Sequence, residues 1–218
     1  MQRTITVKGS GSVSISPDLI VLSLKLRTFR KNYSNAIEAA TKEIDLISSA
    51  IIEAGLKKKD LKTTSFDVET EYERYQDQEG NYKRVFSGYA CHHNLKLKID
   101  FDNKLFSKVL NEISNTSVKP EIEVNFSIKD ERAVKEELLV KATQNASERA
   151  TILTKASGVE LGSLLSIDYN WGELHLYSST DYVYSERMMS LSSESRSFDI
   201  EPDDIKVSDT VTFVWEIN

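Results

Sequence analysis

Two stretches of the chain carry side chains that could do chemistry: the run Cys91-His92-His93, and a row of carboxylates at alternate positions of 67–73. Adjacent residues of a β-strand point to opposite faces of the sheet, so the two histidines cannot hold one metal ion together. Alternate positions of a half-buried strand face solvent, which predicts a solvated acidic row rather than a metal site. One alternative stays open, a hydrolase with a site near His92, His93 and the acidic strand 67–73.

The other signatures of catalysis or cofactor binding are incomplete. Gly9-Ser10-Gly11 resembles the start of a dinucleotide-binding fingerprint, but the third glycine and the following helix are missing. Neither a P-loop Gly-Lys-Ser/Thr nor the Gly-x-Ser-x-Gly elbow of a serine hydrolase occurs. Cys91 is the single cysteine, which excludes an intramolecular disulfide and a cysteine-based zinc site. We therefore predict no catalytic residues, no cofactor and no bound metal.

Charge and hydropathy limit the partners and the location. The 218 residues carry a net charge of -6, which argues against a surface that binds nucleic acid or an anionic membrane. The basic run 57–59 is interrupted by Asp60, and we interpret it as a solvated loop. No segment approaches the roughly 20 apolar residues of a membrane helix, so no membrane insertion is predicted. We expect a cytoplasmic protein if Met1 is native, and a periplasmic or envelope protein if an export signal was removed.

Residues 18–128 follow the order strand, helix, strand, strand, helix, strand. An apolar stripe with steps of three and four residues predicts a helix from Tyr33, and Gly55 stands where its C-terminal cap belongs. A change of apolar phase predicts a β-bulge near residues 87–88, and Asn103 is expected to cap the second helix. This order predicts an α+β fold with a ferredoxin-like βαββαβ domain, in which two helices cover one face of a four-stranded antiparallel sheet.

The segments 1–17 and 129–218 have a different order of predicted elements. The first strand is apolar at its odd positions, and Gly9 and Gly11 on that same face indicate a bend or a close backbone approach. Asp130 can cap a long helix with three alanines at every fourth position, small enough for close packing on a sheet. Two strands end the chain. We predict a discontinuous β-α-β-β domain into which the ferredoxin-like domain is inserted.

A long Ser/Tyr-rich loop, 172–204, separates the last two strands. A loop of this length inside a compact domain is usually functional or mobile. The side chains that suit an interface are its tyrosines and methionines, namely Tyr177, Tyr182, Tyr184, Met188 and Met189. We predict that the loop takes part in self-association, as an arm that orders against another subunit or partner. A mobile excursion and a monomeric module that binds another protein are the alternatives.

Several segments resemble the SIMPL-domain family, and the likeness covers essentially the whole chain. They are the glycine- and serine-rich opening 9–18 that ends in Pro-Asp, the stretch 54–66, the pair Gly88-Tyr89, the segment 126–130, the alanine-striped helix and the segment 158–162. The resemblance implies a bacterial protein of largely unknown function with no accepted catalytic residues. It also implies frequent export to the envelope or periplasm, and ring-like self-assembly.

These observations predict a protein that acts by self-assembly or by binding a protein partner, and not by catalysis. A small antiparallel sheet leaves edge strands whose free backbone groups invite pairing with another chain. We expect a homo-oligomer in which the long helix and the loop 172–204 make the contacts between copies.

Overall fold

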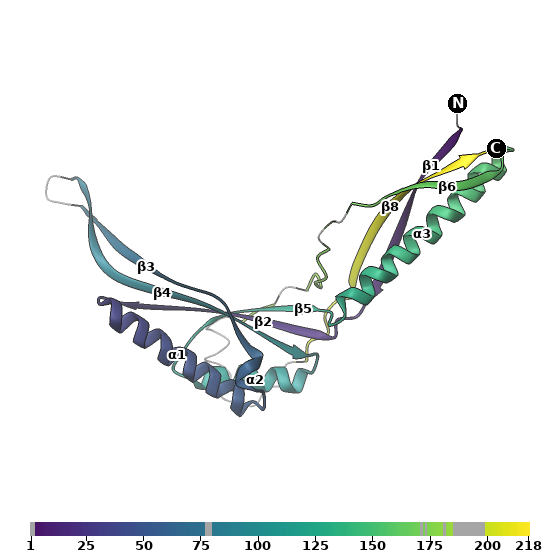
Figure 1. Ribbon diagram of the computed structural model, residues 1–218. Helices are drawn as coiled ribbons and strands as arrows, with labels where there is room; N and C mark the ends of the chain where they lie inside the picture. The colour runs from purple at the N-terminus through teal and green to yellow at the C-terminus, as the bar shows by residue number, and fades with distance from the viewer. Residues whose placement is uncertain (1–2, 77–79, 171, 173, 181, 185–198) are drawn as a thin grey trace. The chain divides into compact units, whose positions relative to one another are not determined.

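The computed structural model describes residues 3–76, 80–170, 172, 174–180, 182–184 and 199–218. This part of the chain is a mixed α/β structure with two antiparallel sheets and three α-helices (Figure 1). The chain divides into two compact units. The large unit comprises Leu19–Phe126 and Thr180–Glu201, and the small unit comprises Met1–Asp18, Ser127–Ser179 and Pro202–Asn218. The predicted mixture of antiparallel sheets and helices is confirmed.

The large unit is built on a five-stranded sheet in the order β3-β4-β2-β5-β7. Its strands are β2 (Leu19–Arg30), β3 (Leu61–Gln76), β4 (Tyr82–Asp100), β5 (Glu121–Ser127) and β7 (Tyr182–Tyr184). β4 pairs antiparallel with β2 and with β3, and β7 pairs antiparallel with β5. The fifth strand was not predicted from the sequence, because three residues are too few to show a strand period. A short piece of the loop 172–204 thus extends the sheet of its own chain.

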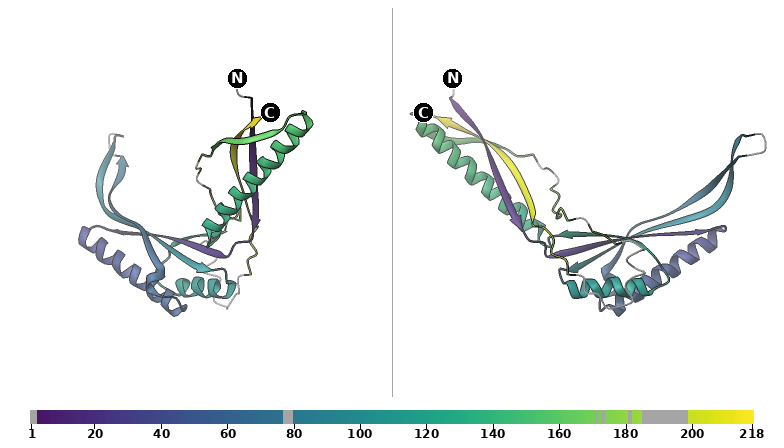
Figure 2. Two further views of the ribbon diagram at one scale, coloured as in Figure 1. Left: turned by 45° about the vertical axis from the view of Figure 1, so that its right-hand side comes forward. Right: turned by 180° about the vertical axis from the view of Figure 1, so that it is seen from behind.

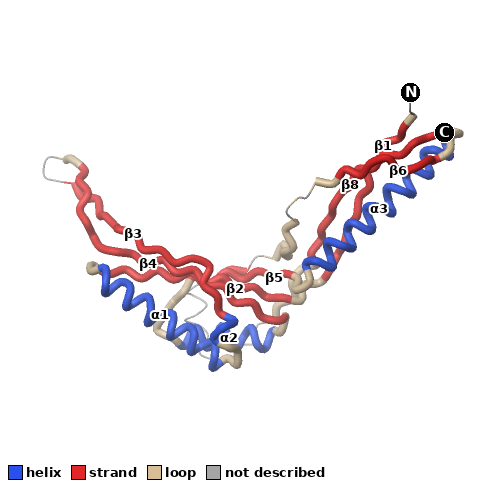
Figure 3. Tube along the Cα trace, in the orientation of Figure 1, coloured by secondary structure: helices blue, strands red, loops and turns tan. Residues whose placement is uncertain are grey.

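Two helices, α1 (Tyr33–Glu53) and α2 (Asn103–Asn115), cover one face of this sheet (Figures 1 and 3). β2 sends Ile20, Leu22 and Leu24 into the core between the sheet and the helices, and each of these side chains is fully buried. Phe106 and Phe126 fill the same core from α2 and β5. The opposite face of β2, β3 and β4 is mostly polar and lies away from both helices.

The helix ends follow the local sequence. The Asn32 side chain accepts hydrogen bonds from two backbone N–H groups in the first turn of α1. Gly55 follows α1 with a φ of 105°, a conformation that glycine adopts without strain, so the predicted cap is confirmed. The predicted cap of α2 is wrong by one residue, because Asp102 and not Asn103 accepts the N–H groups of the first turn. A carboxylate there also interacts favourably with the helix dipole.

The long β3–β4 hairpin contains the predicted bulge and extends past the other strands. The register shifts opposite Ser87, which has no Cα partner on β3, so the bulge is confirmed. β2 reaches along β4 only as far as Tyr89. Residues 72–76 and 82–86 therefore pair only with each other and form a two-stranded ribbon, which projects from the sheet in Figure 1. We call this part of the hairpin the ribbon.

The small unit has a three-stranded sheet in the order β1-β8-β6. Its strands are β1 (Thr4–Ile15), β6 (Leu161–Asp168) and β8 (Ile205–Ile217), and the helix α3 (Glu131–Ala156) lies along one face (Figure 2). Asp130 caps α3 by accepting the Ala133 N–H at 2.9 Å, as predicted. Phe213 and Trp215 of β8 are buried against the helix and stack with their ring centroids 5.4 Å apart.

The two glycines of β1 allow α3 to approach the sheet closely. A Cβ atom at Gly9 would lie 2.0 Å from the Ala142 carbonyl oxygen, and one at Gly11 would lie 2.1 Å from the Leu138 carbonyl oxygen. The helix side chains at this contact are small, and Ala142 and Ala146 are fully buried. The close backbone approach that the glycines predict is confirmed.

Candidate interaction surfaces

The structure separates the two histidines of β4, as their adjacency predicts. His93 pairs across the sheet with the core residue Leu26 and is buried, whereas His92 pairs with Arg27 and lines the polar face. Cys91 is also buried, and burial raises the pKa of its thiol above the ordinary value, so the thiol stays protonated at neutral pH. The run of three residues therefore supplies no nucleophile with an adjacent base.

Burial of His93 should make the stability of the large unit depend on pH. The ring nitrogen Nε2 lies 2.9 Å from Thr63 Oγ1, and Nδ1 has no hydrogen-bond partner within the described part of the chain. Burial lowers the pKa of the ring below its ordinary value of 6.5. The unfolded chain then binds the proton more readily than the folded chain. This contribution to stability is intact above pH 6.5 and is lost as the pH falls below that value.

We expect His93→Gln to reduce the loss of stability between about pH 7.5 and about pH 5.5, measured by urea unfolding. His92→Gln is the matched control, because it removes a histidine of the same strand from the polar face instead of the core. If His93→Gln and the wild type lose stability equally as the pH falls, the pH dependence does not come from burial of His93.

The acidic row of β3 lies on the polar face, as predicted, and half of it is engaged with other side chains. Glu71 forms an ion pair with Arg27, and Glu73 accepts a hydrogen bond from the Ser87 hydroxyl at 2.8 Å. The other two carboxylates of the row are exposed. Among the residues that the structure describes, no three His, Cys, Asp or Glu side chains are grouped so that they could hold a metal ion.

The loop 172–204 begins with contacts to its own unit. Tyr177 forms an isolated antiparallel bridge with Ser127, and the side chain of Leu176 is buried. The Ser127 hydroxyl donates to the Leu176 carbonyl at 2.8 Å. The Tyr177 side chain remains 49% exposed. The start of the loop is therefore held in place while one of its predicted interface side chains faces solvent.

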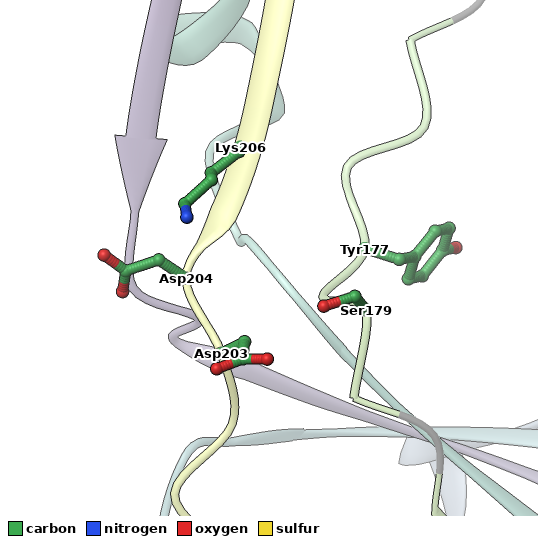
Figure 4. A pocket seen from close by; sticks show the side chains of 5 residues that line it. All are labelled: Tyr177, Ser179, Asp203, Asp204 and Lys206. Atoms are coloured by element: carbon green, nitrogen blue, oxygen red, sulfur yellow. The ribbon is translucent and has the colours of Figure 1, made fainter.

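A depression of about 550 Å³ lies beside Tyr177 (Figure 4). Its lining consists of Tyr177, Ser179, Asp203, Asp204 and Lys206. The Asp204 carboxylate accepts hydrogen bonds from the hydroxyls of Ser16 at 2.7 Å and Ser14 at 3.3 Å. Most of the lining is polar or charged, which does not suit an apolar small molecule.

The other predicted interface residues are placed only in part. Tyr182 and Tyr184 belong to β7, which pairs with β5, and Met188 and Met189 lie outside the described residues. The role of these four residues in an interface stays a prediction.

The ribbon carries an aromatic surface that the sequence reasoning missed. Edge-to-face contacts link Tyr33 to Tyr89 at 5.3 Å, Tyr89 to Phe86 at 5.3 Å and Phe86 to Tyr72 at 6.2 Å, measured between ring centroids. The guanidinium of Arg84 lies 4.9 Å from the centroid of the Tyr72 ring. About half of the Tyr72 and Phe86 side chains is exposed. The sequence alone does not reveal this surface, because it does not show that β2 ends before the hairpin of β3 and β4 does.

The outer edge of β1 is covered by side chains of α3. Three hydrogen bonds join them: Arg149 Nη1 to the Lys8 carbonyl at 3.0 Å, Lys141 Nζ to the Ser12 carbonyl at 3.3 Å, and the Ser10 N–H to Asn145 Oδ1 at 3.1 Å. The backbone groups at alternate positions of β1 therefore have partners although no strand lies beside them. Covering an edge in this way prevents it from pairing with another chain.

At the opposite edge of the small sheet, residues 163–168 of β6 are exposed within the described part of the chain. Within the described chain no side chain hydrogen-bonds to its backbone, and its pairing with β8 has two irregularities. Leu164, Leu165 and Ile167 are 46%, 42% and 57% exposed. The only charged residue of β6 is its last one, Asp168. As far as the structure describes the chain, the small unit thus has one covered edge and one open, mostly apolar edge.

Among the described residues, no helix combines the length and the apolar composition that crossing a membrane requires.

The fold and these surfaces define a mixed α/β protein of two compact units, each with an antiparallel sheet. The model of the SIMPL family, described as "Protein of unknown function (DUF541)", matches residues 5–215. The chain therefore belongs to the SIMPL family, as the sequence resemblance indicated.

Two curated relatives are similar to this chain. Both are called "26 kDa periplasmic immunogenic protein", one from Brucella abortus (strain S19) and the other from Brucella melitensis biotype 1. Each is 28% identical over 165 residues, which are 75% of this chain. The aligned part spans 65% of the length of each relative.

Proposed function

We propose that this protein works without catalysis, by assembling with copies of itself through the open edge of the small sheet. The observation that carries the proposal is the contrast between the two edges, β1 covered by α3 and β6 open and apolar. Natural sheets block exposed edges with charged residues, proline or covering elements, because open edges pair with other strands. One edge of this sheet is blocked in that way, so the open edge is interpreted as a surface that receives another strand.

A second copy of the chain is the partner that suits β6. Because 161–167 has no charged side chain, antiparallel pairing of two β6 strands brings no like charges opposite each other. A two-fold axis between the strands would join two three-stranded sheets into one and would bring Leu164 and Ile167 of both copies together. Main-chain hydrogen bonds would join the two strands, so their side chains need only make apolar contact. The apolar side chains of β6 can make that contact.

We interpret the architecture as a ferredoxin-like domain, 18–128, inserted into a discontinuous domain made of 1–17 and 129–218. The strand order β3-β4-β2-β5 with α1 and α2 on one face supports this interpretation. In this arrangement the two domains carry different contact surfaces, the ribbon on one and β6 on the other. The loop residues Tyr177, Tyr182, Tyr184, Met188 and Met189 would extend the interface or bind a separate protein partner.

A periplasmic location is part of the proposal. Both Brucella relatives are named as periplasmic proteins, which supports it. Fractionation of the native organism would test it, since recovery in the cytoplasmic fraction contradicts the proposal.

His92 lines a pocket on the polar face together with Asp67 and Glu69, whereas His93 is buried on the other face of the sheet. The hydrolase alternative would therefore have one histidine at its site instead of two, which supports the proposal of no catalysis. A broad hydrolase screen tests this part of the proposal, and turnover that disappears in His92→Ala or His93→Ala would overturn it.

The decisive variant of the assembly proposal is Ile167→Lys. A lysine on an edge strand blocks pairing because its charge cannot be buried against another strand. Ile167 is 57% exposed, so the change should leave the fold intact. We expect the wild type to exceed the monomer mass at tens of micromolar. The variant should weaken self-association at least about tenfold, measured by analytical ultracentrifugation.

Thr6→Lys is the matched control, since it adds the same charge to an exposed position of the covered strand β1. It should keep the wild-type mass. A monomeric wild type at these concentrations would overturn self-assembly, and an unchanged mass in Ile167→Lys would remove β6 from the interface.

A further inference from the structure

A basic groove on the polar face of the large sheet brings together four lysines that are dispersed in the sequence. The groove has a volume of about 390 Å³ and is lined by Lys59, Asp60, Lys62, Lys96 and Lys98. We call it the lysine groove. The sequence shows only the interrupted basic run 57–59, which we interpreted as a solvated loop. The fold places Lys62 of β3 and Lys96 and Lys98 of β4 beside this run. More lysines therefore lie together in the structure than the sequence run shows.

Strand register places the lysines close to one another. Lys62 at the start of β3 is the direct Cα partner of Lys96 on β4, and Lys98 follows two residues later on the same face. Lys59 belongs to the 3-10 turn Lys58–Asp60 that leads into β3. Like charges directly opposite each other destabilise a sheet, so the lysine pair is unfavourable unless an anion lies between its ammonium groups.

The anionic groups nearby in sequence do not neutralise the groove. The Asp60 carboxylate accepts the Lys57 backbone N–H at 2.9 Å and so caps the turn. Other lysines of this unit have acidic partners: Lys58 lies 3.6 Å from Asp45, and Lys25 lies within 3.6 Å of two glutamates. Within the described chain, by contrast, no ion pair joins any of the four groove lysines to a carboxylate. With four lysines and one carboxylate, Asp60, the lining keeps a net positive charge in a chain whose net charge is -6.

We propose that the lysine groove binds a phosphate-bearing anion. An ammonium group is a compact point charge with three donors, and several of them around one concave site suit the high charge density of phosphate oxygens. Residues two apart on a strand are separated by roughly 7 Å, so Lys62, Lys96 and Lys98 can approach one phosphate group from different sides. The lining has neither arginine nor an aromatic ring, which disfavours stacking of nucleic-acid bases. The phosphate comes either from a free oligophosphate or from the headgroup of an anionic lipid.

The two sources are separated by two binding measurements on the intact chain. The first is calorimetric titration with inorganic tripolyphosphate. The second is co-sedimentation with vesicles of phosphatidylglycerol and phosphatidylcholine, compared with vesicles of phosphatidylcholine alone. Binding of tripolyphosphate would identify a free oligophosphate as the ligand of the groove. Binding to the phosphatidylglycerol vesicles would identify a lipid headgroup as the ligand. Absence of binding in both arms at low salt overturns the proposal.

Variants test whether the groove is the site. We expect Lys62→Gln with Lys96→Gln to weaken the binding about tenfold or more, and raised salt to weaken the wild type in the same direction. Lys8→Gln with Lys155→Gln is the matched control, because it removes the same charge from exposed positions of the small unit and should change the affinity less than about twofold. Equal weakening in both pairs would show a general charge effect and overturn the site. Lys59→Gln with Lys98→Gln repeats the test if the first pair fails to fold.

Discussion

Gly11→Ala should destabilise the small unit severely. The added Cβ atom would lie 2.1 Å from the Leu138 carbonyl oxygen and 2.9 Å from the Ala142 backbone nitrogen. Both contacts are with helix backbone, which cannot rotate away as a side chain can. Relief of the clash requires α3 to move off β1, and this separates the alanines of the helix from the sheet. Overpacking of this kind costs typically about 1–3 kcal/mol, and we expect the upper end or more because the obstacle is backbone.

Thermal unfolding followed by circular dichroism would measure the effect. A loss of about 3 kcal/mol corresponds to a fall in Tm of roughly 12 °C or more for a unit of this size. Gly172→Ala is the matched control, since a Cβ atom there has no neighbour within 4 Å, and its Tm should remain near that of the wild type. Equal Tm values for Gly11→Ala and the wild type would mean that the helix does not pack on β1 as described.

Features that depend on neighbours in the sequence could be predicted. Apolar periodicity identified α1, and Gly55 marked its end because the left-handed conformation after a helix favours glycine. The bulge at Ser87 followed from a change of phase within one strand, which only an extra residue can produce. The two glycines of β1 indicated a close approach, although the sequence could not say that the approaching element is α3.

The register between strands and the exposure of their edges could not be predicted. The lysine groove exists because Lys62 and Lys96 stand opposite each other, and that register is decided by the hairpin and its bulges rather than by local composition. The open edge at β6 follows from the strand order β1-β8-β6, in which the last strand of the chain lies in the middle. Likewise, the ribbon is exposed only because β2 is shorter than the hairpin beside it. Chemical suitability of a residue can be judged from the sequence, but its exposure depends on topology.

The second large effect concerns the two cores. Phe106 is fully buried in the core of the large unit, and Phe213 is 2% exposed in the core of the small unit. Replacing a buried phenylalanine with alanine removes its apolar contacts and leaves a cavity, at a cost of about 3–5 kcal/mol. Because the two rings belong to separate clusters of buried residues, we expect Phe213→Ala to destabilise the small unit and Phe106→Ala to destabilise the large one.

Native-state hydrogen exchange can assign each loss to its unit. In Phe213→Ala, amides of β1, α3 and β8 should exchange at least about a hundredfold faster, since every 1.4 kcal/mol changes the opening equilibrium about tenfold. Amides of β2 and β4 should keep their protection, and the reverse pattern should hold in Phe106→Ala. Each variant is thereby the control of the other. Acceleration of both sets of amides in either variant would show that the chain unfolds as one cooperative structure, and the proposed division into 18–128 and the two flanking segments would then fail.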